Sequence, residues 1–222
     1  RREYRPGYKE AFTYLGRPEG LVMLSQQCRD IEVWDCVMTG RSCTIKIGSE
    51  NMDSIQNVTF DRCVIRASNR GLGIQNRDEG TVTNVTFQNM VVECRLFSDV
   101  WWGKAEPIYV TSYPRAVGNH KDAGWRFPRG AKAGRCGEVS HITFRNIKGW
   151  SENGSFVGAD VTGKVHHITL DGVDIAPQRV TTYPQGVYDR RPCLGEGFIH
   201  ERPQGVITEN CEVTIMSEPK EP

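Results

Sequence analysis

Apolar and polar positions alternate along five short segments of the chain that resemble one another. Between residues 55 and 63, apolar Val58 and Phe60 alternate with polar Thr59 and Asp61. This period of two predicts a β-strand with one buried face. The five segments begin at Cys28, Ile55, Val82, Val139 and Val165, and a frayed sixth covers residues 206–211.

The segments recur at a nearly constant interval. Asp30, Asn57 and Asn84 follow one another every 27 residues, and His141 and His167 lie 26 residues apart. We expect these five residues to form one column at a turn, where stacked amides can hydrogen-bond along the column. The longer interval of 57 residues between Asn84 and His141 indicates two coils with an additional loop.

A second set of short apolar segments lies between the first ones, at residues 44–48, 72–75, 107–111, 155–158 and 197–200. A strand of about five residues cannot enclose a core alone, whereas coils stacked about 4.8 Å apart can. The pattern therefore predicts an all-β fold, a right-handed parallel β-helix of about six coils. We expect a lead-in or cap at 1–19, the β-helix at 20–216 with a long insertion at 112–137, and a polar tail at 217–222.

The charge balance of the chain excludes two classes of partner. Its 222 residues include 28 basic and 27 acidic side chains, so no overall field favours nucleic acid or a membrane surface. No apolar run approaches the roughly 20 residues of a transmembrane helix. We therefore expect no nucleic-acid partner and no membrane partner.

The eight cysteines fall into two groups. Four occupy apolar repeat positions and are expected to be buried as small hydrophobic residues: Cys28, Cys36, Cys63 and Cys211. Four lie outside the repeat, and their pairing is left open: Cys43, Cys94, Cys136 and Cys193. No Cys-x-x-Cys pair is present, so we expect no metal site and no cofactor.

Several stretches resemble the polygalacturonase family of glycoside hydrolases, family 28. They are Ile45-Lys-Ile-Gly-Ser-Glu50, the repeat from Ile55 to Ile65, and Asn69-Arg-Gly-Leu-Gly-Ile-Gln75. The segments Trp102–Thr111 and Val187–Pro192 are similar to parts of bacterial relatives. The resemblance covers roughly residues 20–215. It implies a β-helix that hydrolyses pectin-type polysaccharide, and we expect an extracellular or periplasmic location.

The chain differs from that family at two of its motifs. The histidine of the family's Gly-His-Gly falls on Cys43, and its Arg-Ile-Lys falls on Gly73, Ile74 and Gln75. The family's acidic motifs would lie upstream of these segments. The resemblance therefore implies the fold, and it assigns no catalytic residue in this chain. Whether further coils precede Arg1 in the natural protein is left open.

Candidate catalytic residues follow from the chemistry of glycoside hydrolysis. The reaction needs two carboxyl groups, about 5 Å apart in retaining enzymes and roughly 6.5–9.5 Å apart in inverting ones. Equivalent positions on adjacent coils lie about 4.8 Å apart, so a β-helix face can provide either separation. The candidates are Glu106, Glu50 and Asp160. Glu106 is preferred because it lies in the segment most similar to the family.

Candidate substrate-binding residues come from outward strand positions, aromatic pairs and basic loops. Outward positions form a regular track, aromatic rings stack on sugars, and the basic insertion would suit a uronate. The candidates are Lys46, Gln75, Arg77, Trp101, Trp102, Tyr109, Arg115 and Arg190.

Two alternatives to hydrolysis are open at this point. One is a non-catalytic carbohydrate-binding or structural β-helix, which the two altered motifs favour. The other is a polysaccharide lyase or epimerase on the same fold. Fold analogy does not separate these functions, and the sequence identifies neither the glycan nor the oligomeric state.

Overall fold

The computed structural model is all-β in the part of the chain that it describes, residues 27–49, 51–97, 103–114, 135–178, 180–181 and 206–216. Its strands form two sheets, and neighbouring strands within each sheet pair in parallel. This arrangement is consistent with the expected β-helix. No helix in the described residues is long and apolar enough to span a membrane.

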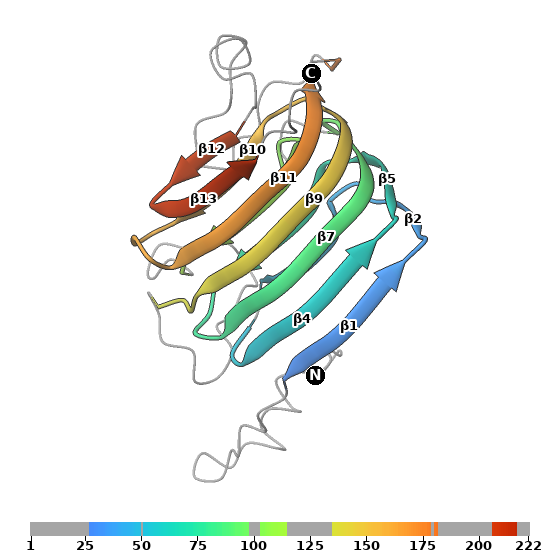
Figure 1. Cartoon of the computed structure of the whole chain (residues 1–222). Coiled ribbons are helices and arrows are strands. Elements are labelled where there is room, and N and C mark those ends of the chain that lie inside the picture. Colours follow the sequence, from blue (N-terminus) through green and yellow to red (C-terminus); the bar gives the residue numbers. More distant parts are fainter. Residues whose placement is uncertain are drawn as a thin grey trace, which may run out of the picture.

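The first sheet collects the repeated segments in chain order. Figure 1 shows its long strands side by side, from β1 in blue to β11 in orange. Its members are β1 (Cys28–Trp34), β2 (Val37–Thr39), β4 (Ser54–Asp61), β5 (Val64–Ser68), β7 (Thr81–Cys94), β9 (Val139–Ser151), β11 (Val165–Pro177) and β13 (Cys211–Met216). The five full segments expected from the repeat therefore lie in one sheet.

The second sheet collects the intervening segments. Its members are β3 (Cys43–Ser49), β6 (Arg70–Asn76), β8 (Glu106–Ser112), β10 (Ser155–Ala159) and β12 (Val206–Glu209). Four of them coincide with the expected second set, whereas the expected strand at 197–200 lies outside the described residues.

The predicted column of polar residues is confirmed, although it lies within the strands rather than at turns between them. Asp30, Asn57, Asn84, His141 and His167 all have φ between 53° and 59°. Asn57 Nδ2 donates to Asp30 Oδ1 at 2.8 Å, and Asn84 Nδ2 donates to Asn57 Oδ1 at 2.7 Å. These residue types tolerate the left-handed region and bend each strand at the same place.

Two details of the predicted register are wrong. Val82 of β7 pairs directly with Val139 of β9, so the interval from Asn84 to His141 contains one coil and an insertion instead of two coils. The expected sixth copy at 206–211 is also misplaced. Val206–Glu209 pairs with β10 in the second sheet, and the strand that follows β11 is Cys211–Met216.

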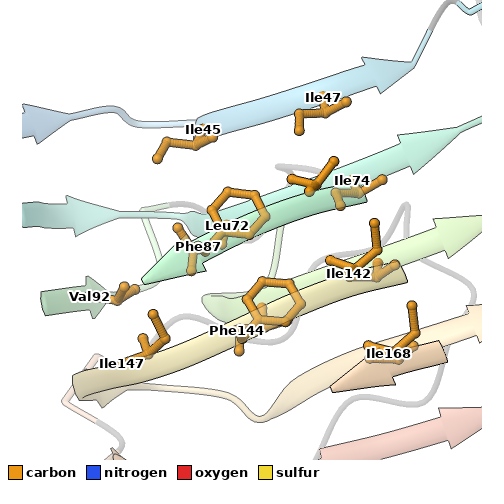
Figure 2. Packing of buried hydrophobic residues seen from close by; sticks show 14 of the residues in the cluster. Ile45, Ile47, Leu72, Ile74, Phe87, Val92, Ile142, Phe144, Ile147 and Ile168 are labelled. Carbon is orange, nitrogen blue, oxygen red and sulfur yellow. The ribbon is translucent and has the colours of Figure 1, made fainter. Parts of the chain in front are cut away.

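The core lies between the two sheets, as Figure 2 shows. Ile45, Ile47, Leu72 and Ile74 point inward from the second sheet. Phenylalanine rings stack from rung to rung on the first sheet, with centroids 5.2 Å apart for Phe60–Phe87 and 5.0 Å for Phe87–Phe144. Burial of this regular apolar column is the main source of stability.

The cysteine predictions are confirmed in part. Cys63 is buried and stacks inside with Met90, while Cys36 and Cys211 are half-buried. Cys28 is exposed, which contradicts its expected burial, because β1 is the edge strand of its sheet. Cys211 pairs with Val165 rather than occupying the column of Cys63. Among the cysteines left open, Cys43, Cys94 and Cys136 are free thiols, and Cys193 lies outside the described residues.

Candidate functional site

The outward positions of the second sheet bring several candidate residues onto one face. Ile47, Ile74, Val110 and Val157 pair in register and point into the core, so the neighbouring positions point outward. One outward column contains Lys46, Gly73, Tyr109 and Phe156. The next contains Gly48, Gln75, Thr111, Gly158 and Glu209.

Glu106 lies at the start of this face in a buried ion pair. Arg70 Nη2 donates to its Oε1 at 2.8 Å, and Arg70 Nε donates to its Oε2 at 3.2 Å. The backbone N–H of Lys104 also donates to Oε2, at 2.7 Å. Glu106 was expected to be accessible, but its exposed fraction is only 5%. Both oxygens are engaged, which suits a fixed charge better than proton exchange.

Aromatic rings continue the face from this ion pair. The guanidinium of Arg70 lies 3.4 Å from the ring centroid of Tyr109, in a cation–π contact. The Tyr109 ring is 5.8 Å from that of Phe156 and is tilted by 30°. All three side chains are buried. The middle of the face is therefore a packed layer, not an open track.

Gly158 allows two aromatic groups to approach the backbone of β10. A Cβ at this position would lie 2.8 Å from Phe156 Cζ and 3.1 Å from the hydroxyl oxygen of Tyr113. The absence of a side chain thus lets Tyr113 lie against β10, beside the carboxyl end of the sheet.

Two exposed carboxylates flank Tyr113 at this end. The Tyr113 hydroxyl donates to Glu209 Oε2 at 2.6 Å. Asp160 follows β10, and its N–H donates to the carbonyl of Ser112 at 3.2 Å, which places it beside Tyr113. Burial, followed by the hydrogen bond and charge of Glu209, raises the pKa of Tyr113 well above its usual range. The phenol therefore keeps its proton and acts as the donor.

The register sets the separation of Asp160 and Glu209. Glu209 pairs with Gly158, two residues before Asp160, on the adjacent strand. Strands about 4.8 Å apart with a rise of about 3.3 Å per residue put their Cα atoms about 8 Å apart. Their carboxyl groups can therefore reach the roughly 6.5–9.5 Å separation of inverting glycosidases.

A buried thiol lies beneath Asp160. Ser112 Oγ donates to Cys136 Sγ at 3.1 Å, and the thiol points to Asp160 Oδ1 at 3.7 Å. Burial raises the pKa of Cys136, and the hydrogen bond from Ser112 opposes this rise. A protonated thiol can donate weakly to the carboxylate, which holds one oxygen of Asp160 in place.

The remaining predicted residues are placed as follows. Lys46 is exposed at the β3 end of the face, and Gln75 and Arg77 are half-exposed. Tyr109 is buried, as described above. Glu50, Trp101, Trp102, Arg115 and Arg190 lie outside the described residues, as do most of the insertion and the whole of the segments 1–19 and 217–222.

Sequence reasoning did not single out Tyr113 or Glu209. Residues 206–211 were assigned to the first strand set, which removed Glu209 from the outward face of the second sheet. Its position four residues before the next apolar alternation at Val213–Ile215 was the available signal. In the described part of the chain, no group of three or more His, Cys, Asp or Glu residues is arranged to hold a metal ion.

Comparison with known proteins leaves the family of this chain open. The chain matches no family model, no curated protein and no solved structure.

Proposed function

We propose that the chain is a right-handed parallel β-helix of about six coils that hydrolyses an acidic, pectin-type polysaccharide. Six parallel segments in the first sheet support the coil number. The observation that carries the function is a pair of exposed carboxylates near Tyr113: Glu209 accepts from its hydroxyl, and Asp160 is held through its backbone to Ser112. The sequence resemblance to polygalacturonases agrees with this proposal, as does an extracellular or periplasmic location.

In this mechanism one carboxyl group protonates the glycosidic oxygen while the other takes a proton from water. The bond between the anomeric carbon and that oxygen breaks, and water forms the new bond to the same carbon. We assign Glu209 as the base, because the Tyr113 hydroxyl that donates to its Oε2 holds that carboxylate in place. Asp160, held from below by the Cys136 thiol, is then the acid.

Basic side chains on the same face would pair with the negative charges of the substrate. Lys46 and Arg77 are accessible there, and a uronate carboxylate pairs well with either cation. Arg115, Arg190 and the two tryptophans at 101 and 102 remain predicted contributors. Glu106 becomes a supporting residue, because Arg70 occupies both of its oxygens.

The test is the release of reducing ends from polygalacturonate. Asp160→Asn and Glu209→Gln should each lower kcat by about 10²-fold or more, because each removes one proton-transfer group. Asp174→Asn is the matched control, since it removes an exposed carboxylate from the first sheet and should leave the rate unchanged. Equal activity in all three variants would exclude this carboxylate pair.

A non-catalytic carbohydrate-binding role is the second candidate. It is favoured by the packed middle of the face, where Arg70, Glu106 and Tyr109 are already engaged with one another, and by the altered motifs at Cys43 and Gly73–Gln75. Binding of acidic oligosaccharide without any product would support this candidate. A lyase would instead release unsaturated sugars that absorb in the ultraviolet.

A further inference from the structure

Three histidines gather on the far side of the molecule from the proposed active site. His166 and His167 are consecutive in β11, and His141 of β9 occupies the position equivalent to His167. Consecutive residues of a regular strand point to opposite faces. The left-handed conformation of His167, with φ of 53°, breaks this alternation and turns both imidazoles of β11 to the same side.

The three rings lie within contact of one another. The His166 and His167 centroids are 4.8 Å apart, and the Nδ1 atoms of the two rings are only 2.6 Å apart. The His141 ring stacks on that of His167 at 4.7 Å and lies 6.1 Å from that of His166. His141 and His167 are exposed and His166 is half-exposed, so a dissolved ion can reach the group.

We propose that the Nδ1 atoms of His166 and His167 form a binding site for a borderline-soft divalent cation of the zinc class. At 2.6 Å one Nδ1 atom must carry a proton and donate it to the other, and a cation bound by both nitrogens can replace that proton. With Zn–N bonds of about 2.0–2.1 Å at the tetrahedral angle, the nitrogens would lie about 3.3 Å apart. A small rotation of two accessible rings provides this separation.

The surroundings of the pair suit such a site. Glu138 Oε2 lies 3.6 Å from Nε2 of His166, on the side of the ring away from the proposed ion. A carboxylate in this position orients a ligating histidine and increases its basicity. Water completes the coordination around the two imidazole nitrogens.

The chain itself provides matched substitutions for the test. Asn57 and Asn84 occupy the same left-handed column as His167, so His167→Asn preserves the backbone. Gln56 occupies the same register position as His166, so His166→Gln is equally conservative. His120→Gln combined with His200→Gln removes the other two histidines of the chain and serves as the control.

The proposal is tested by titrating the full chain with Zn²⁺. Binding is followed by the chemical shifts of the individual imidazole ¹⁵N signals in NMR spectra and by calorimetry. We expect one ion per chain, shifts at His166 and His167, and a loss of affinity of at least about tenfold in either single variant. Glu138→Gln should weaken binding less, and the control should bind normally. Unchanged binding in both single variants, or no imidazole shift at millimolar Zn²⁺, would overturn the proposal.

Discussion

At the residue scale, the left-handed positions determine where each strand bends. A second column of them contains Asp35, Arg62, Asn89, Asn146 and Gly172, with φ between 49° and 60°. Asn146 Nδ2 donates to Asn89 Oδ1 at 2.8 Å, so this column also carries hydrogen bonds from rung to rung. Polar residues at these bends satisfy one another along the stack.

The phenylalanine column gives the first prediction. Phe87 has no exposed surface and stacks between Phe60 and Phe144. Phe87→Ala should therefore lower the free energy of unfolding by about 3–5 kcal/mol, as for other large core truncations. Thr86→Ala, on the outward face of the same strand, is the control and should cost less than about 1 kcal/mol. Denaturant unfolding measures both, and a small effect at Phe87 would contradict the stacked core.

The half-buried thiol of Cys43 gives a prediction about pH. Burial raises the pKa of Cys43 from 9.0 to about 11, and Arg70 opposes this rise. Above pH 9 the unfolded chain loses this proton while the folded chain keeps it, so stability falls as pH rises until about pH 11.

The comparison for this prediction is Cys43→Ala under reducing conditions. Between pH 9 and about 11, the free energy of unfolding of the original chain should fall by about 2 kcal/mol more than that of the variant. Parallel pH profiles of the two proteins would show that the Cys43 thiol ionises equally well in the folded and unfolded states.

At the element scale, the close fit of β7 to β9 rests on Gly149. Its φ is 147°, and a Cβ there would lie 2.0 Å from the carbonyl oxygen of Val92, its partner in β7. Gly163 also has a positive φ, of 90°, but nothing lies within 4 Å of its Cβ position. A side chain at Gly163 would therefore meet backbone strain alone, whereas one at Gly149 would meet both backbone strain and a steric clash.

Alanine at each of these glycines gives the third prediction. Gly163→Ala should cost about 1–2 kcal/mol from backbone strain alone. Gly149→Ala should cost about 3 kcal/mol or more, because the strand pairing must also shift. Thermal or denaturant unfolding measures the difference, and equal losses would contradict the close approach of β7 and β9.

The sequence predicted most strands because their alternation and their column of Asn, Asp and His residues recur at one interval. It could not distinguish an inserted loop from a missing rung between Asn84 and His141, since both lengthen the interval equally. It misplaced residues 206–209 because a short apolar pair fits either sheet. It could not predict that Glu106 is enclosed, because the Arg70 side chain that pairs with it comes from another coil.

At the scale of the whole molecule, the two sheets differ in the use of their outer faces. The outer face of the first sheet carries half-exposed threonines in register, at Thr59, Thr86, Thr143 and Thr169. The outer face of the second carries a buried charged and aromatic layer that ends in two exposed carboxylates. This asymmetry is the reason for assigning substrate to the second sheet.

Hydrogen–deuterium exchange of the full chain, with and without a pectic oligosaccharide, tests this assignment most directly. We expect added protection at the carboxyl ends of β8, β10 and β12, around Tyr113, Asp160 and Glu209, and none along the first sheet. Protection confined to the first sheet, or no protection at a saturating concentration of the oligosaccharide, would contradict it.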